Sequence, residues 1–204
     1  PERGEQRIKG PVIIRHGDSE LIFPEYCELL LDNTYQSGSW YEINRSKSDE
    51  ILSDELFTLC IDHGVQPQNA EYAYIVRPHV DPQLPPVPDI RILANHSRLQ
   101  AVYHPDLQIW QCVFYIPGAL TVGNFDVRMN HPGLLLLHQN ESSMQVCLSD
   151  PTQMLDQLTV SVSGHWIGEG CRYESGQDIT HIDFTLPVGG DAGKSVMRTI
   201  VLNK

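Results

Sequence analysis

Residues 157–163 read QLTVSVS, with apolar side chains at alternate positions from Leu158 onward. Neighbouring side chains on a β-strand point to opposite faces, so this period of two predicts a strand with one buried face. The same alternation returns in residues 180–186, and residues 196–202 form a further apolar run near the end of the chain. We therefore expect this part of the protein to be built from β-strands.

Shorter runs with turn residues between them extend this pattern towards the N-terminus. Two of them read as hairpins: residues 99–103 and 107–116 around His104-Pro105-Asp106, and residues 134–138 and 144–148 around the polar turn 139–143. Residues 56–61 (LFTLCI) and 71–76 (EYAYIV) predict two earlier strands. Such spacing is typical of an antiparallel β-sandwich. The best candidate for a helix is residues 48–56, which is too short to be stable by itself.

One change in composition predicts a domain boundary. Residues 78–88 read PHVDPQLPPVP and contain five of the 14 prolines. Proline lacks a backbone donor and is excluded from central strands, so this segment is expected to be a stiff, extended connector. We predict a β domain over residues 1–80, a linker over 81–88 and a second β domain over 89–204.

The charge of the chain argues against nucleic acid as a partner. The formal net charge is −12, from 14 basic and 26 acidic residues. Nucleic-acid binding depends on a basic face that neutralises phosphates. No apolar run approaches the ~20 residues that a membrane-spanning helix needs. We expect neither nucleic acid nor a membrane span.

The spacing of the potentially reactive residues predicts no metal site and no phosphate site. None of the five cysteines forms a C-x-x-C pair; we expect free, buried thiols, with one disulfide left open. No H-x-x-x-H pair exists among the nine histidines, so each is expected to be structural. Residues 189–195 (GGDAGKS) lack the spacing of a phosphate-binding loop and predict a glycine-rich hairpin turn.

Two long stretches carry a resemblance to a known family. The first is GSWYEINRS (38–46) followed by DELFTLCIDHGVQPQNAEYAYIVRP (54–78). It resembles the end of the central β-domain of the family 8 polysaccharide lyases. The second is residues 90–118 together with LSDPTQ (148–153) and VSVSG (160–164), which is similar to the C-terminal β-sandwich of the same family.

The resemblance implies both an architecture and a reaction. Family members combine an N-terminal α/α-toroid, a large central β-sandwich and a small C-terminal β-sandwich. This chain would hold the last strands of the central domain and all of the C-terminal one, with the toroid and the rest of the central domain as its partners. The implied reaction is β-elimination at a uronic acid of an acidic polysaccharide, in a secreted or periplasmic protein. Chondroitin sulfate and hyaluronan are the expected substrates.

The catalytic groups of the family do not match this sequence. An Asn, a His, a Tyr and an Arg of the toroid, with a Glu from the earlier central domain, are implied to abstract the C5 proton and neutralise the carboxylate. We assign no catalytic residue, metal or cofactor to this chain. Four aromatic residues are candidates for sugar stacking, although a role as core or hairpin aromatics explains them better: Trp40, Tyr41, Trp110 and Trp166.

Three functions remain open from the sequence. The first is a structural, non-catalytic portion of a lyase. The second is an autonomous carbohydrate-binding module, which predicts exposed, coplanar aromatic side chains on one sheet. The third is a cell-surface adhesion domain, which predicts an exposed apolar patch for a protein partner. The solvent exposure of the three tryptophans separates the second from the first.

Overall fold

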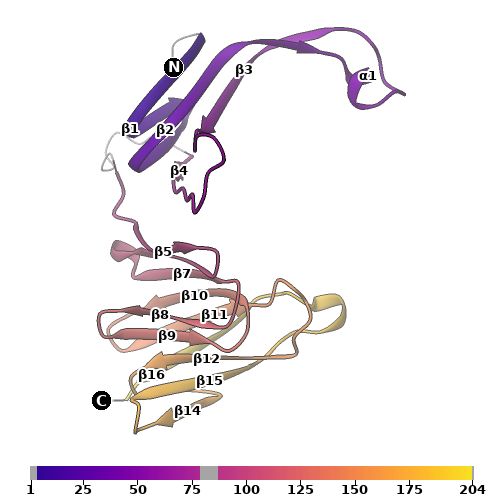
Figure 1. Ribbon diagram of the computed structural model, residues 1–204. Coiled ribbons are helices and arrows are strands. Elements are labelled where there is room, and N and C mark those ends of the chain that lie inside the picture. Colours follow the sequence, from indigo (N-terminus) through magenta and orange to yellow (C-terminus); the bar gives the residue numbers. More distant parts are fainter. Residues whose placement is uncertain (1–3, 79–86, 204) are drawn as a thin grey trace. The chain divides into compact units, whose positions relative to one another are not determined.

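The computed structural model describes residues 4–78 and 87–203, which form two compact units, residues 1–88 (unit 1) and 89–204 (unit 2). Both units consist of antiparallel strands (Figure 1), which confirms the predicted all-β fold. Most of the predicted linker, residues 81–86, lies outside the described residues. No helix in the described part of the chain is long and apolar enough to cross a membrane.

Unit 1 is a four-stranded sheet in which one long strand pairs with all the others. Its elements are β1 (Gly4–His16), β2 (Ser19–Gly38), α1 (Trp40–Ile43), β3 (Leu52–Ile61) and β4 (Ile75–Arg77). β1 runs along one edge of β2, while β3 and β4 share the other edge. A small core holds this sheet together, with Ile14, Phe23, Leu29 and Leu31 buried on it.

Two sequence predictions for unit 1 are wrong in detail. The helix predicted over residues 48–56 is absent, because residues 52–61 pair with β2 and place Phe57, Leu59 and Ile61 against the core. Tertiary pairing here outweighs the weak local preference for a helical turn. The strand predicted over 71–76 is confined to Ile75–Arg77, and the tyrosines before it lie in a loop.

Unit 2 contains two sheets. Its elements are β5 (Arg91–His96), β6 (Leu99–His104), η1 (Pro105–Leu107), β7 (Ile109–Phe114), β8 (Gly118–Val122), β9 (Phe125–Met129), β10 (Gly133–Gln139), β11 (Ser143–Ser149), β12 (Gln157–Ser163), β13 (Trp166–Ile167), β14 (Cys171–Glu174), β15 (Ile179–Thr185), η2 (Gly189–Asp191) and β16 (Val196–Leu202). Seven strands form one sheet in the order β13-β16-β11-β10-β7-β6-β5, and five form the other in the order β14-β15-β12-β9-β8. Both predicted hairpins and the strand over 157–163 are present.

The core of unit 2 lies between these sheets. Alternate residues of β10 and β11 from one sheet and of β12 and β15 from the other form a single buried cluster, including Leu137, Val146, Val160 and Ile182 at 0% exposure. The opposite face of the five-stranded sheet is polar. There Ser161 Oγ lies 2.9 Å from His181 Nδ1, and His181 Nε2 lies 3.2 Å from Glu174 Oε2. This division explains the strict alternation of residues 157–163.

The chain passes between the two sheets at corners, and one corner is closed by a buried carboxylate. Asp150, 3% exposed, follows β11 and precedes β12. Its Oδ1 accepts hydrogen bonds from the backbone N and the hydroxyl of Thr152, and its Oδ2 accepts from the backbone N of Met154 and of Leu155. Burial raises the pKa of Asp150, but these hydrogen bonds outweigh it and hold the pKa below its usual value.

The glycine-rich segment 189–195 is a second corner, and the prediction that it forms a hairpin turn is wrong. It joins β15 to β16, which belong to different sheets. Gly193 has φ of +84°, and a Cβ there would lie 3.1 Å from the side chain of Gln153 in the Asp150 corner. The two corners therefore pack against each other, and the positive φ favours glycine at position 193.

All five cysteines are free thiols, and they differ in burial. Cys112 is buried, which raises its pKa to about 12. Cys60 is exposed, so the expectation that it would be buried is wrong. Its strand, β3, exposes one face to solvent along most of its length.

Candidate saccharide-contacting surface

Trp166 belongs to the core of unit 2. Its side chain is 5% exposed, and the indole N–H donates a hydrogen bond to the backbone oxygen of Ser163 at 2.8 Å. The backbone N of Trp166 donates to Thr180 Oγ1, whose hydroxyl in turn donates to the backbone oxygen of Gly164. No face of this indole is open to a sugar, so Trp166 acts as a packing residue.

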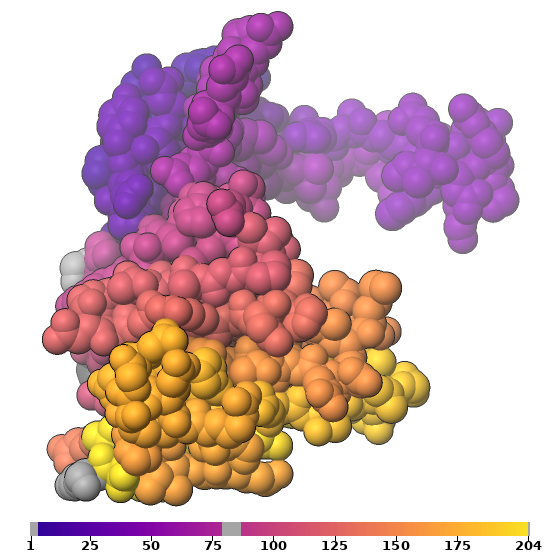
Figure 2. Space-filling model, turned by 60° about the horizontal axis from the view of Figure 1, so that its bottom comes forward, coloured from indigo at the N-terminus to yellow at the C-terminus, as the bar shows by residue number. Residues whose placement is uncertain are grey.

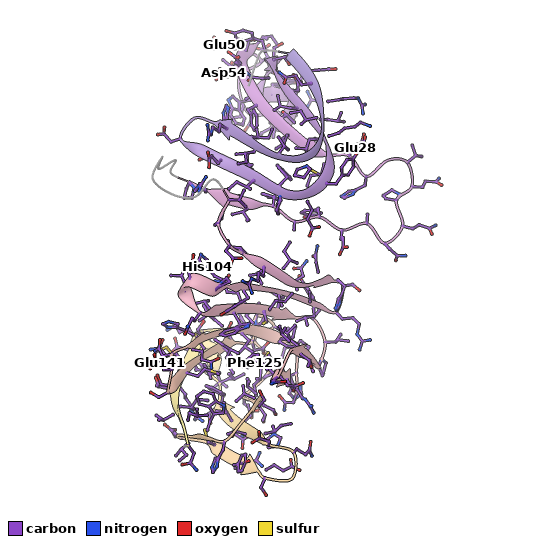
Figure 3. All side chains as sticks on the ribbon, turned by 90° about the vertical axis from the view of Figure 1, so that its left-hand side faces the viewer. Glu28, Glu50, Asp54, His104, Phe125 and Glu141 are labelled. Atoms are coloured by element: carbon purple, nitrogen blue, oxygen red, sulfur yellow. The ribbon has the colours of Figure 1, made fainter. Side chains whose placement is uncertain are left out.

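Trp110 is engaged by other aromatic rings. Its centroid lies 4.2 Å from that of Tyr103 on the neighbouring strand β6 and 5.1 Å from that of Phe125 on the opposite sheet, and both pairs are stacked. Figure 3 labels Phe125 among the side chains of unit 2. Trp110 also packs against the buried cluster. The indole thus joins the two sheets, and stacking on a sugar would require one of these rings to move away.

Trp40 and Tyr41 occupy a different setting, at the end of a projecting arm. The arm comprises residues 34–56: the end of β2, the turn region 39–51 (the tip) and the start of β3, paired from Thr34 with Leu56 to Gly38 with Leu52. Figures 1 and 2 show the arm extending away from the rest of unit 1. Trp40 is 59% exposed and Tyr41 39% exposed. These two are the predicted aromatic residues that have a ring open to solvent.

Local hydrogen bonds give the tip a defined shape. Asn44 N donates to the backbone oxygen of Trp40 at 2.8 Å and ends the single helical turn α1. The side-chain oxygen of Asn44 then accepts from both the backbone N and the hydroxyl of Ser46. Tyr41 N donates to the backbone oxygen of Ser48 at 3.0 Å, which closes the loop. The sequence INRS therefore encodes a turn that holds Trp40 and Tyr41 in place.

A cation lies next to the aromatic pair. The Cζ atom of Arg45 is 4.6 Å from the ring centroid of Tyr41, a cation–π distance. An exposed aromatic ring beside a guanidinium can stack on a sugar ring and pair with a carboxylate or sulfate at the same time. The sequence prediction did not include Arg45, which follows the extended C-cap Asn44 of α1, so that its contact with Tyr41 depends on the shape of the turn.

The remaining titratable residues within 4–78 and 87–203 lie in separate local settings. His16 stacks on Phe57, His63 faces Tyr72, and His181 lies in the polar face of unit 2. In the described ranges, no group of three or more His, Cys, Asp or Glu side chains could hold a metal ion. The most deeply buried acid of unit 1, Glu20, is neutralised by Arg77 and Arg15; its hydrogen bonds to Arg77, then to Arg15, lower its pKa.

Two models of one known protein family match this chain. The model of the polysaccharide lyase family 8 super-sandwich domain matches residues 1–84, and that of the family's C-terminal β-sandwich domain matches residues 91–159. The chain belongs to polysaccharide lyase family 8. The two matched regions follow one another in the chain and correspond to unit 1 and to about the first three-fifths of unit 2.

Several characterised members of family 8 are similar to the chain. Chondroitinase-AC of Pedobacter heparinus is 32% identical over 165 residues, which is 76% of this chain and 23% of that protein. Hyaluronate lyase of Thermasporomyces composti is 30% identical, covering 70% of this chain and 18% of that protein. Xanthan lyase of Bacillus sp. is 26% identical, covering 92% and 21%. The chain thus spans about a fifth of the length of these family 8 relatives.

Solved structures of family 8 enzymes share the fold. A structure of chondroitinase AC lyase, determined with oligosaccharide complexes, superposes with a TM-score of 0.81 at 27% identity, covering 97% of this chain and 29% of that one. Paenibacillus xanthan lyase superposes with a TM-score of 0.79 at 23% identity, which supports the fold alone.

Proposed function

We propose that this chain is the non-catalytic C-terminal β portion of a polysaccharide lyase that cleaves uronic-acid-containing polysaccharides by β-elimination, with chondroitin sulfate or hyaluronan as substrate. The observation that carries the proposal is the ordered match to two β modules of family 8, over a chain about a fifth as long as the family's enzymes. The α/α-toroid and the rest of the central domain would be its partners. The substrate is a polymer outside the cell, so we also propose a secreted or periplasmic location.

The chemistry of the reaction supports a non-catalytic role. β-Elimination requires a base at the C5 proton and groups that neutralise the uronate carboxylate as charge develops. Arg77 and Arg15 are committed to Glu20, Arg172 to Asp183, and Arg128 to Asp126. In these four pairs the guanidinium is already matched with a carboxylate of the same chain. Three of the described histidines are also engaged within the chain: His16 stacks on Phe57, His63 lies against Tyr72, and His181 bonds to Ser161 and Glu174.

The alternative, an autonomous carbohydrate-binding module, has less support. It predicts coplanar aromatic rings exposed on one sheet, whereas Trp166 is buried and Trp110 is stacked within the sandwich. The exposed Trp40 lies on a turn at the end of the arm. A projecting arm with an aromatic tip suits a lyase portion that completes a cleft together with other domains. An autonomous module would instead need a flat aromatic surface of its own.

Lyase activity of the isolated chain tests the proposal. The chain is incubated with chondroitin sulfate and with hyaluronan, and the ultraviolet absorbance of the unsaturated uronate product is followed, with chondroitinase-AC of Pedobacter heparinus as positive control. We expect no product from the chain under conditions in which the control goes to completion. Formation of the unsaturated product by the chain, at a rate proportional to its concentration, would overturn the proposal.

A further inference from the structure

A line of four aromatic rings runs from the core of unit 1 to its surface. Phe23 is buried on β2, and its ring centroid lies 5.5 Å from that of Tyr74. Tyr74 is followed by Tyr72 at 6.4 Å and Tyr72 by His63 at 6.1 Å. The planes of Tyr72 and Tyr74 differ by only 19°. We call these four residues the aromatic row; none of its members was among the candidates derived from the sequence.

The loop that carries His63, Tyr72 and Tyr74, residues 62–74, is fixed at its start. Asp62 Oδ1 accepts a hydrogen bond from the backbone N of Gly64 at 2.9 Å, and Asp62 Oδ2 pairs with Arg7 Nη1 on β1 at 3.3 Å. The hydrogen bond from Gly64, followed by the pairing with Arg7, lowers the pKa of Asp62, although partial burial opposes this. The backbone N of Asp62 also donates to the backbone oxygen of Glu28. Asp62 therefore ties the start of the loop to two strands, to β1 through its carboxylate and to β2 through its backbone N–H.

The outer part of the row is open, and the loop that leads to it carries exposed amide side chains. Tyr74 is 45% exposed and Tyr72 60% exposed. The loop between His63 and Tyr72 contains exposed amides of Gln66, Gln68 and Asn69. Large exposed rings tethered to the core are rigid, and amides supply both donors and acceptors. Figure 2 shows this segment standing out from the body of unit 1.

We propose that Tyr72 and Tyr74 form a stacking subsite for a pyranose ring of a polysaccharide, with the amides of residues 66–69 as hydrogen-bonding partners for its hydroxyl groups. This inference rests on the proposed function, which supplies the polysaccharide. A pyranose presents an apolar face of C–H groups and an equatorial rim of hydroxyls, and the row with its amides offers a surface of matching kind. Because the loop has no excess of cations, the subsite recognises the sugar ring itself; its charge is recognised elsewhere.

Amide chemical shifts of the isotope-labelled chain, titrated with a hyaluronan or chondroitin tetrasaccharide, test this subsite. We expect shifts at residues 63–74 that saturate with added oligosaccharide. Tyr72→Leu keeps an apolar side chain but removes the ring, so it should weaken binding about three- to tenfold, the range of one aromatic contact. Tyr72→Phe keeps the ring and should bind within about twofold of the unchanged chain.

Tyr26→Ala is the matched control, because this tyrosine is 68% exposed and lies on β2 outside the row. It should leave binding unchanged. The inference is overturned when residues 63–74 do not shift, when shifts are confined to the tip (39–51), or when Tyr72→Leu binds as well as the unchanged chain. If the chain forms unsaturated product, the proposed function is contradicted, but the binding result at Tyr72 and Tyr74 still stands. If the chain is inactive and residues 63–74 show no chemical-shift change, the subsite alone is contradicted.

Discussion

Replacing Asp150 by asparagine removes the charge that closes a corner between the two sheets of unit 2. The variant keeps the size of the side chain and one acceptor oxygen, which can still serve Thr152. The new NH2 group then faces the backbone N–H groups of Met154 and Leu155, whose hydrogen bonds of 2.9 Å are lost. The two partly buried backbone N–H groups would then face another donor in place of their acceptor.

The magnitude follows from these lost bonds. A hydrogen bond to a charged group contributes about 1.5–3 kcal/mol, and partial access of water reduces the loss, so we expect Asp150→Asn to lower the free energy of unfolding of unit 2 by about 2–4 kcal/mol. Domains have total stabilities of about 5–15 kcal/mol, so this is a large fraction. The midpoint of thermal unfolding should fall by roughly 10 °C.

Urea unfolding followed by tryptophan fluorescence measures this loss. Trp110 and Trp166 lie in unit 2 and Trp40 in unit 1, so a Trp40→Phe background makes the signal report on unit 2. The pKa of Asp150 is lower in the folded chain than its unfolded value of about 3.9. Its contribution is therefore complete above about pH 5 and disappears as the pH falls through the folded pKa. The difference in free energy of unfolding between the unchanged chain and Asp150→Asn should therefore shrink as the pH falls.

Asp156→Asn is the control, since Asp156 lies in the same connection but is exposed. It should change the stability by less than about 0.5 kcal/mol. The reasoning is refuted if Asp150→Asn is no less stable than the control at neutral pH, or if its deficit is the same at pH 3 as at pH 7.

Three further predictions follow from burial and charge. Leu137→Ala empties a fully buried site of unit 2 and should lower its free energy of unfolding by about 2–5 kcal/mol in the same fluorescence assay. A thiol reagent at pH 8 should modify the exposed Cys60 quickly and Cys112 only after unfolding, which counting modified thiols over time measures. Glu20→Gln should destabilise unit 1 at neutral pH, because it leaves Arg77 facing a neutral group. That deficit, read by circular dichroism, should diminish in acid, since Arg77 and Arg15 lower the pKa of Glu20 in the folded chain.

Strand alternation allowed most of unit 2 to be predicted from the sequence, because both of its sheets bury one face. Residues 157–163 and 196–202 have the same bounds in the sequence pattern and in the structure. Unit 1 was harder to predict. β1 and β2 contain polar residues at inward positions, such as Glu20, whose burial depends on Arg77 from a strand far away in the sequence. Local periodicity cannot reveal such a partner.

The candidate site was predictable only in part for a similar reason. Sequence analysis named the tryptophans, but ring burial depends on tertiary neighbours: Trp110 is covered by Phe125 from the opposite sheet, whereas Trp40 lies on a turn without such a neighbour. Tyr72 and Tyr74 alternate as a strand would, and this suggested sheet positions. The loop 62–74 leaves the sheet, because β4 pairs with β2 only from Ile75.

The motifs that carry the family resemblance share one structural task. Asn44 in INRS, Asp62 in IDHG and Asp150 in SDPT each place a side-chain oxygen on backbone N–H groups that follow it in the chain. A chain leaving a strand exposes unpaired donors, and a short side-chain acceptor satisfies them locally. These motifs therefore determine how the loops are shaped. The three loops carry different features. Asn44 stabilises the tip that bears Trp40, Asp62 fixes the start of the loop that bears Tyr72 and Tyr74, and Asp150 stabilises a corner between the two sheets of unit 2. The tip and the aromatic row are exposed, so side-chain variants there should leave the fold intact, and under the proposed subsite variants of Tyr72 and Tyr74 should alter polysaccharide binding.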